Sequence, residues 1–433
     1  MVLKIMVLKM LDTLYQRIEA KRDELISLTQ DLVRIPTLNP PGEFYDDCCH
    51  YLGDRLEKRG FHVEYFRAEG TPGDSDRYPR VNVVARKEGS GGGPCVHFNS
   101  HIDVVAVGSG WQEDPFQAEL KGDRIFGRGT CDMKGGLAAS VVAVEAYLEL
   151  FPDHPGAIEI SGTADEETGG YGGVAWLAEQ GVMAVPRIDH VIIPEPLNKD
   201  RVCLGHRGVW WAELETKGHI AHGSMPFDGD SAIRHMGALL EKFESDLYPH
   251  LARKKTAMPV VPPGARESTM NINSIHGGED EGFDGLPAAI VADSCRAIID
   301  RRFLIEEKLD EVKAEVHDLV AMLKAERPGF ECDIRDMWEV APTMAPEDAP
   351  VVTAVSSAIE DILGYKAEHV VSPGTYDQKH IDRIGKLDNC IAYGPGILTL
   401  AHQPDEYVEV QDMIDSAKVM ANALHRLLTG EAA

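Results

Sequence analysis

Short apolar runs alternate with helical patterns through the first half of this chain, and this alternation limits the fold to an α/β sheet. Runs typical of buried strands occur at 95–99, 157–163 and 190–193. Helical patterns cover 12–35, 45–59, 137–150 and 173–180. A strand that is followed by a helix and another strand is typical of parallel pairing. The pattern therefore predicts a mostly parallel sheet.

Histidine or acidic residues stand at the ends of these predicted strands. His101 follows the first strand, Glu166 and Glu167 follow the second, and Glu195 lies just beyond the third. In an open α/β sheet, ligand-binding side chains gather beyond the carboxyl ends of the strands. Imidazole and carboxylate groups are the ligands of zinc-like ions in hydrolytic sites. The order of these residues predicts a metal-dependent hydrolase.

The pattern changes near residue 205 and changes back near 340. Strand patterns at 209–216, 270–275, 290–299 and 330–338 enclose helical patterns at 229–247 and 305–325. This order is β-α-β-β-α-β, a compact α+β unit. A length of 433 residues also favours two domains. We expect a catalytic domain formed by 1–205 and 341–433, and an inserted domain at 206–340.

The charge and the cysteines narrow the class of protein. The formal net charge of −28 disfavours binding to nucleic acid or to an anionic membrane. Eight cysteines occur without a C-x-x-C pair, which is typical of a reducing compartment. The opening MVLKIMVLKM is too short and too charged for a signal peptide, and it leaves Met1, Met6 or Met10 as the start. We expect a cytoplasmic protein.

Six motifs follow one another in the order of a known family. They are HID at 101–103, GRGTCDMKGG at 127–136, TADEETGG at 163–170, PEP at 194–196, AHGSMP at 221–226 and GPGILTLAHQPDEYV at 394–408. They span most of the chain, which resembles the acetylornithine deacetylase / succinyl-diaminopimelate desuccinylase family of metal-dependent deacylases and metallopeptidases. The resemblance implies a zinc-peptidase-like catalytic domain. It also implies that the inserted domain makes a homodimer or a higher homo-oligomer.

The resemblance further implies two divalent metal ions per chain, expected to be zinc, with cobalt or manganese as alternatives. Asp132 would bridge the ions, because two neighbouring cations need a shared anion to offset their repulsion. His101 and Glu195 would complete one site, and Glu167 and His402 the other. Glutamate, aspartate and histidine at these positions match the family motifs.

Two further carboxylates would serve the reaction. Glu166 would be the general base that takes a proton from metal-bound water. Asp103 would lie behind His101, accept its other ring N–H and fix its tautomer.

Residues of the inserted domain would assist. His222, which matches the motif better than His219, would polarise the scissile carbonyl, often across a dimer. Arg302 would hold a substrate carboxylate through its guanidinium fork, although the neighbouring Arg301 is an alternative.

Each ligand taken alone has an ordinary structural interpretation. Glu166 and Glu167 could begin a solvated helix, where acidic side chains complement the dipole. Asp132 could be a turn residue, Glu195 a surface strand end and His402 a loop histidine. Cys131 lies beside Asp132, but no thiolate partner accompanies it in the sequence. The joint order and the flanking glycines favour the metal site.

The expected substrate pocket departs from the family pattern. Segment 374–379 reads GTYDQK where desuccinylases carry GTSDGR, so Tyr376 follows Thr375 in place of a serine and Lys379 replaces an arginine. Leu398 stands where desuccinylases have an asparagine, and Gly285 where the family often has one. We expect Thr375, Tyr376 and Leu398 to contact the substrate, and we hypothesise a substrate with an apolar or aromatic portion.

The sequence therefore predicts cleavage of the amide bond of an N-acyl amino acid or a related small carboxylate. A dipeptidase or metallo-carboxypeptidase is the first alternative, since the same catalytic set serves it. Hydrolysis of a non-amide C–N bond, which would release ammonia, is the second. A binding protein on an inactive enzyme fold is disfavoured because Glu166 and the ligand set are intact.

Overall fold

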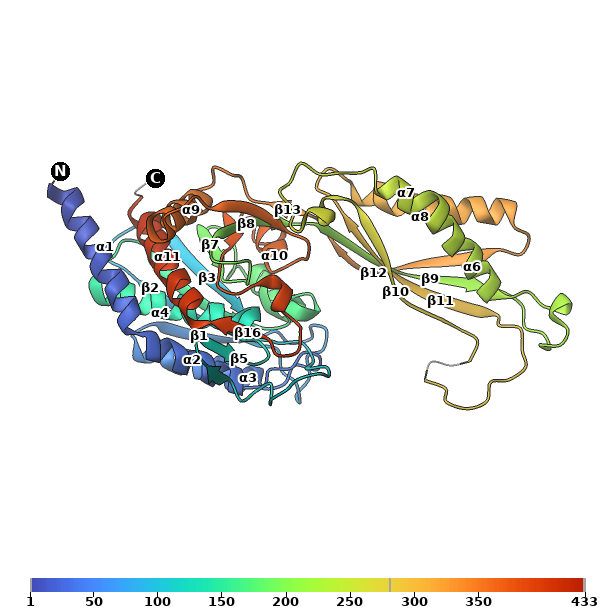
Figure 1. The fold of residues 1–433 in the computed structure, drawn as a ribbon, viewed down its shortest axis with the longest axis horizontal. Coiled ribbons are helices and arrows are strands. Elements are labelled where there is room, and N and C mark those ends of the chain that lie inside the picture. Colours follow the sequence, from blue (N-terminus) through green and yellow to red (C-terminus); the bar gives the residue numbers. More distant parts are fainter. Residues whose placement is uncertain (1, 280–281, 431–433) are drawn as a thin grey trace. The chain divides into compact units, whose positions relative to one another are not determined.

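The computed structural model describes residues 2–279 and 282–430 of the chain (Figure 1). The chain divides into two compact units. The first comprises Met1–Gly205, Met344–Val370 and Tyr376–Ala433, and the second comprises His206–Thr343 and Val371–Thr375. The second unit contains the whole insertion expected at 206–340 and, in addition, a short returning segment. Within the described ranges, no helix is both long enough and apolar enough to cross a membrane.

A nine-stranded sheet, counted over the described residues, carries most of the first unit. Its order is β1 (His62–Arg67), β2 (Val81–Glu88), β6 (Ala157–Thr163), β3 (Cys95–His101), β7 (His190–Ile193), β15 (Cys390–Ala392), β8 (Arg201–His206) and β13 (Thr343–Met344), while β14 (Glu368–Ser372) also pairs with β8. The four central strands, β6, β3, β7 and β15, pair in parallel. Strands β1, β2 and β8 join them antiparallel. The predicted parallel sheet is thus confirmed at its centre.

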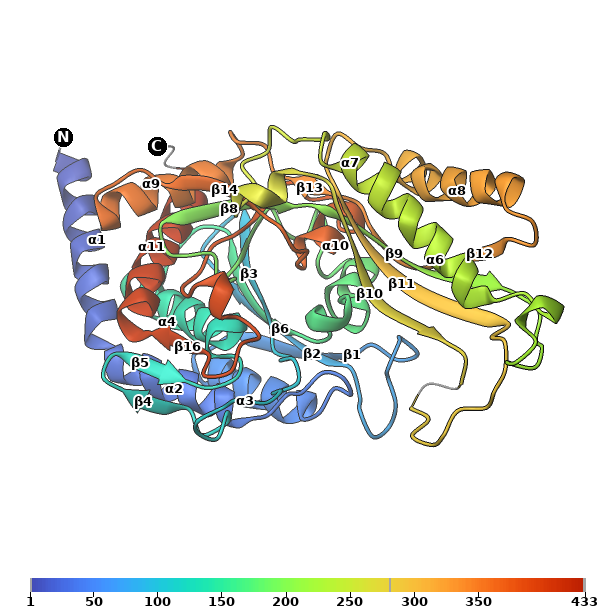
Figure 2. The ribbon, with the colours of Figure 1, turned by 45° about the vertical axis from the view of Figure 1, so that its right-hand side comes forward.

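Strands β3 and β6 are buried along their whole length. Parallel strands are covered on both faces, and this explains why these two segments read as continuous buried runs rather than as alternating patterns. Figure 2 shows α4 and α11 on one side of the central strands and α10 on the other. A three-stranded sheet of β16 (Tyr407–Glu409), β5 (Arg124–Phe126) and β4 (Glu119–Lys121) also belongs to this unit.

The helices of the first unit include one in each of the segments expected at 45–59, 137–150 and 173–180. They are α1 (Val2–Ala20), α2 (Arg22–Arg34), α3 (Tyr45–Lys58), α4 (Gly135–Leu150), α5 (Trp176–Glu179), α9 (Pro350–Leu363), α10 (Gln378–Arg383) and α11 (Val410–Thr429). The single helix expected at 12–35 is wrong, because the backbone leaves the helical region at Lys21, where ψ is 12°. The break lets α1 pack on α4 and α11, while α2 packs on α4 and on the turn that contains Asp132.

The second unit has the predicted β-α-β-β-α-β order. Its elements are β9 (Gly208–Lys217), α6 (Ala232–Lys242), α7 (Tyr248–Leu251), β10 (Thr269–Gly277), β11 (Ser294–Phe303), α8 (Leu309–Glu326) and β12 (Glu331–Val340). The strands form an antiparallel sheet in the order β10-β11-β9-β12. The strand expected at 290–299 begins only at Ser294, because Ile290 and Val291 pair with His222 and Ala221 instead.

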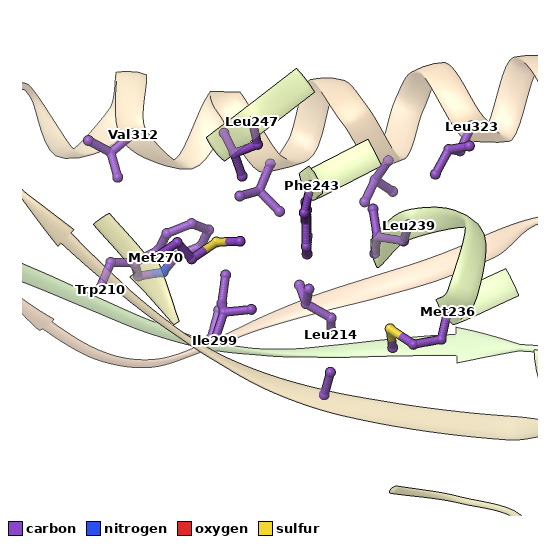
Figure 3. Close-up of a cluster of buried hydrophobic side chains, with 14 of the residues drawn as sticks. Trp210, Leu214, Met236, Leu239, Phe243, Leu247, Met270, Ile299, Val312 and Leu323 are labelled. Atoms are coloured by element: carbon purple, nitrogen blue, oxygen red, sulfur yellow. The ribbon is translucent and has the colours of Figure 1, made fainter. Parts of the chain in front are cut away.

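The core of the second unit lies between its sheet and its helices (Figure 3). Trp210 and Leu214 alternate with half-buried residues along β9 and point into this core, together with Ile299 of β11. Leu239 and Val316 cover them from α6 and α8. The period-two pattern of β9 and the spacing of apolar residues on both helices therefore account for the unit.

Candidate metal centre

His101 is the last residue of β3 and is almost fully buried. Its Nδ1 atom lies 3.0 Å from the main-chain oxygen of Asp103 and 3.5 Å from Oδ1 of the same residue. A carbonyl oxygen can only accept, so Nδ1 carries the proton and Nε2 presents a lone pair. The nearer acceptor is the carbonyl of Asp103, not its carboxylate as expected, but the resulting tautomer is the one that suits a metal ligand.

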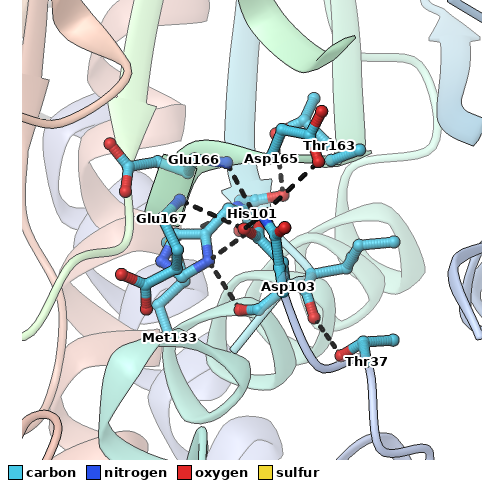
Figure 4. Close-up of polar contacts among 12 residues, drawn as sticks. Thr37, His101, Asp103, Met133, Thr163, Asp165, Glu166 and Glu167 are labelled. Carbon is cyan, nitrogen blue, oxygen red and sulfur yellow. Dashed lines mark hydrogen bonds and ion pairs between the residues drawn. The ribbon is translucent and has the colours of Figure 1, made fainter. Parts of the chain in front are cut away.

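The Asp103 carboxylate mainly holds the turn that follows β6 (Figure 4). The backbone N–H of Glu166 donates to its Oδ1 at 3.2 Å, and that of Glu167 donates to its Oδ2 at 3.1 Å. The side-chain amide of Asn39 donates to Oδ2 at 2.8 Å. One buried carboxylate therefore fixes the ends of two strands, β3 and β6, relative to each other, and it sets the direction of both glutamates.

Three further predicted ligands, Asp132, Glu195 and His402, come from turns or from a segment just beyond a strand. Asp132 lies in the turn Thr130–Lys134, which connects β5 to α4. Glu195 stands two residues beyond β7 and is 7% exposed. His402 follows the short turn Leu398–Leu400, and about half of its side chain is exposed. The parallel centre of the sheet thus delivers His101, the Glu166-Glu167 turn and Glu195 at its carboxyl edge.

The structure brings the five predicted ligands together in two sets that share Asp132. One set contains His101, Asp132 and Glu195, and the other contains Asp132, Glu167 and His402; within each set the donor atoms lie within 4.8 Å of one another. Asp132 Oδ1 lies 3.1 Å from His101 Nε2, and its Oδ2 lies 3.4 Å from His402 Nε2. Each oxygen of Asp132 therefore faces a different set, as a bridging carboxylate would.

The charges of this cluster favour cations. Burial and the nearby Asp132 raise the pKa of Glu167 to about 7 and hold that of Glu195 well above its ordinary range. Hydrogen bonds to Asp132 and Glu167 raise the pKa of His402 to about 10. Three crowded carboxylates thus repel one another and attract positive charge. Two divalent ions would supply that charge, so the donor set fits the metals that the resemblance implies.

Glu166 belongs to neither donor set, although it is adjacent to Glu167. Its Oε1 accepts a hydrogen bond of 2.7 Å from Lys379 Nζ, and the Lys379 side chain is buried. Burial lowers the pKa of Lys379, but the charges of Glu166 and Asp377 raise it by more. The pKa of Lys379 is therefore higher than usual. Asn99 in turn donates to Asp377 at 2.9 Å. A carboxylate beside the donor sets and outside them suits a general base.

Residues of segment 374–379 and Leu398 were expected to contact substrate, and they differ in exposure. Tyr376 is 4% exposed, and its hydroxyl donates to Gln378 Oε1 at 2.6 Å. Thr375 is half-buried, whereas Leu398 is among the exposed large apolar residues. The Tyr376 ring therefore packs inside the first unit, and the hypothesis of an apolar substrate portion now depends on Leu398.

His222 and Arg302 lie in the second unit, and their part in the site stays a prediction. The backbone N–H of Ser224 donates to His222 Nδ1 at 3.1 Å, so Nε2 of this exposed ring carries the proton. Arg302 donates from Nε and Nη2 to Asp300 at 2.7 and 3.0 Å. Arg301 is buried and pairs with Glu307 and Glu315, so its contacts indicate a structural role.

Several site residues were not foreseen in these roles. In the sequence, Lys379 stands out only as a departure from the arginine of the family motif, and no pattern marks Asn39 or Asp377. Glu406 stands within a motif, and its Oε1 accepts from the backbone N–H of Asp132 at 3.1 Å, a contact that the motif does not predict. Only the Lys379 substitution gave a signal in the sequence; the other contacts join segments that are far apart along the chain.

The chain is similar to known proteins over most of its length. The model for Peptidase family M20/M25/M40 matches residues 97–426. A succinyl-diaminopimelate desuccinylase of Nitrosospira multiformis is 28% identical over 414 residues, which cover 94% of this chain and 99% of that protein. The desuccinylase of Cupriavidus pinatubonensis is 29% identical over 413 residues, covering 93% and 99%.

Solved structures share the fold at lower identity. Human carnosine dipeptidase 1 superposes with a TM-score of 0.76 at 18% identity, covering 97% of this chain and 99% of that one. A metallo-carboxypeptidase of Sulfolobus solfataricus also gives 0.76 at 18% identity, covering 94% and 99%. On the family match and the full-length relatives, the chain belongs to peptidase family M20/M25/M40 and is a metal-dependent amidohydrolase.

Proposed function

We propose that the chain hydrolyses the amide bond of an N-acyl amino acid or a related small carboxylate. The observation that carries this proposal is the pair of donor sets that share Asp132, while Glu166 stands beside them, outside both sets and paired with Lys379. The relatives that align over 93–94% of the chain at 28–29% identity are desuccinylases, and this supports an acyl group on nitrogen as the part that is removed.

Five residues would hold the metal ions: His101, Asp132, Glu167, Glu195 and His402. When bound, two zinc-like ions supply charge that acidifies the attacking water and polarises the scissile carbonyl. We propose zinc as the native metal. Oxygen donors and histidine also bind cobalt or manganese, so these two metals are the alternatives.

Glu166 would move the proton. It would accept a proton from the attacking water through Oε2, while Lys379 keeps Oε1 in place at 2.7 Å. The proton would then pass to the nitrogen of the departing amine as the C–N bond breaks. His222 would donate from Nε2 to the oxygen on which negative charge develops, since Nδ1 already accepts from Ser224.

The second unit would supply recognition and assembly. Arg302 would exchange its bond to Asp300 for a substrate carboxylate, because the same fork geometry suits both partners. We also propose that 206–340 mediates a homodimer or a higher homo-oligomer, which light scattering of the purified protein tests directly; a monomer at micromolar concentration would refute it. Leu398 favours a substrate whose acyl or side chain has an apolar portion.

A peptidase is the second candidate, and one observation favours it. The solved structures that share the fold over nearly their full length include a human dipeptidase and an archaeal metallo-carboxypeptidase. The same water attack and the same proton transfer by Glu166 would cleave a peptide bond. Hydrolysis of a non-amide C–N bond is a more distant alternative that the same residues could perform.

A substrate panel separates these functions. The purified protein, loaded with zinc, is incubated with N-succinyl and N-acetyl amino acids of differing side chains, with dipeptides, and with amines that would release ammonia. We expect deacylation of an N-acyl amino acid that is lost on chelation. Faster cleavage of dipeptides would replace the deacylase by the peptidase, and ammonia without a carboxylic acid would indicate the third reaction. Selective turnover of N-acetylornithine would refute the apolar substrate hypothesis.

A further inference from the structure

We propose that Glu406 and Arg128 form a clamp that positions Asp132 and His402, so that both donor sets are assembled before any metal ion enters. This inference rests on the proposed role of these residues as ligands. Neither Glu406 nor Arg128 belongs to a donor set, and both are about 1% exposed. They are positioning residues, because they contact the segments that carry the ligands and would not contact the metal ions themselves.

Glu406 gathers the backbone of the turn that carries Asp132. Its Oε1 accepts from the backbone N–H groups of Gly129 at 3.0 Å, Cys131 at 2.9 Å and Asp132 at 3.1 Å. The turn is not helical at Asp132, where φ is −119° and ψ is 95°. Its N–H groups therefore need an acceptor from elsewhere, and a carboxylate is the strongest one available.

Arg128 connects this carboxylate to the segment that carries His402. Its Nη1 donates to Glu406 Oε2 at 2.5 Å and to the carbonyl of Gln403 at 3.3 Å. Its Nη2 donates to the carbonyl of His402 at 3.2 Å and to that of Val107 at 3.2 Å. The Arg128 guanidinium thus joins three parts of the chain. They are the segment after Asp103, the segment that carries His402 and, through Glu406, the turn that carries Asp132.

The register of a small sheet places the two clamp residues side by side. Glu406 immediately precedes β16, which pairs with β5 so that Tyr407 lies opposite Phe126. The N–H of Gly127 donates to the carbonyl of Glu406 at 2.9 Å and extends this pairing by one step. Segments almost three hundred residues apart therefore meet at the bridging ligand by way of main-chain pairing.

The clamp also explains how an unfavourable backbone conformation persists. His402 has a φ of 64°, a left-handed conformation that is unfavourable for a non-glycine residue. The bond from Arg128 to its carbonyl oxygen holds it there. Without that bond, His402 is free to leave the donor set, because its side chain is about half exposed. Ligand positions that are fixed in advance raise metal affinity, and loss of such support typically costs 10–100-fold.

The test titrates zinc alone into metal-free protein by calorimetry. Glu406→Gln keeps the size of the side chain but removes its charge, and Arg128→Lys keeps the charge but removes the fork that reaches the carbonyls. Glu159→Gln is the matched control, because Glu159 is also buried and paired with an arginine, Arg86, but contacts no ligand residue. Thermal unfolding of each metal-free variant reports its folding separately.

We expect Glu406→Gln to weaken zinc binding about 10–100-fold at both sites, since both use Asp132. Arg128→Lys should weaken mainly the site that uses His402. Glu159→Gln should bind zinc like the wild type. A purely structural role would lower the unfolding temperature and leave the affinity of the folded protein unchanged; that result overturns the clamp. If Glu406→Gln does not fold, wild-type affinity in Arg128→Lys overturns it as well.

Failure of the clamp and failure of the proposed function give different results. Zinc affinities that follow the predicted order, in a protein that cleaves no N-acyl amino acid, would support the clamp and contradict the function. Unchanged zinc affinity in Glu406→Gln, with deacylation intact, would contradict the clamp and leave the function standing. A wild-type protein that binds none of zinc, cobalt and manganese contradicts both.

Discussion

Replacing Glu166 with glutamine removes a carboxylate that stands at the metal centre but belongs to neither donor set. Glutamine has nearly the same size, and its oxygen can still accept from Lys379 across the present 2.7 Å. It cannot accept a proton from water. We therefore expect metal binding within a few-fold of wild type and turnover reduced by about 10²–10⁴, the usual effect of losing a general base. At about 1.36 kcal/mol per tenfold change, this is about 2.7–5.4 kcal/mol of transition-state stabilisation.

The surroundings of Glu166 also predict a cost in stability. Lys379 is buried, and the substitution removes the negative charge that faces it while the charge of Asp377 remains nearby. Because the ammonium keeps a hydrogen-bond acceptor, we expect a loss of about 1–3 kcal/mol in the free energy of unfolding rather than complete unfolding. The kinetic comparison should therefore be made well below the unfolding temperature of the variant.

The assay measures kcat and KM on the best substrate of the panel, with metal content determined on the same samples. A lost proton acceptor should lower kcat and leave KM nearly unchanged. Glu179→Gln, at an exposed carboxylate on α5, controls for removal of a negative charge from the chain. A decrease of less than about tenfold in kcat would refute the role of Glu166. Loss of a metal ion would instead identify Glu166 as a ligand.

Three further predictions address the ligands, the second unit and the acid stability. His402→Ala should reduce the metal content from about two ions to one per chain, because the set of His101 and Glu195 stays complete; mass spectrometry of the desalted protein measures this. Phe243→Ala, at a fully buried core position, should destabilise the second unit by about 3–5 kcal/mol without changing metal content, as calorimetric unfolding would show. Burial would raise the pKa of Glu24, but hydrogen bonds from Lys21 and Arg55 lower it to about 2. Glu24→Gln should therefore cost about 1–2 kcal/mol at pH 7, after allowance for solvent screening, and the difference from wild type in urea unfolding should vanish as the pH falls from about 4.5 to 2.

The fold was predictable where the local pattern and the tertiary environment agree. β6 and β7 have the expected bounds, since continuous apolar runs mark them without ambiguity. The break at Lys21 has no such mark, because the helical pattern continues through it and only the packing of α1 and α2 on different neighbours requires it. β1 and β2 were not foreseen, since their polar residues hide the alternation.

The donor sets were predictable from the family resemblance, because each ligand stands in a short motif that matches the family. What supports the ligands was not predictable in the same way. Asp103 was expected to serve the His101 ring, yet its carboxylate mainly holds the Glu166-Glu167 turn. Glu406 acts on Asp132 only through the pairing of β16 with β5. Such contacts depend on how distant segments meet, and a single sequence carries no local signal for that.

The central claim is that the two sets around Asp132 hold metal ions that the hydrolysis requires. The most direct measurement is the metal content of the purified protein by mass spectrometry, combined with deacylation before chelation, after chelation and after zinc is restored. The account predicts about two equivalents of a zinc-like metal, activity that disappears on chelation, and activity that returns with zinc. A protein that binds no metal even after reloading, or that cleaves amides equally well without metal, would contradict it.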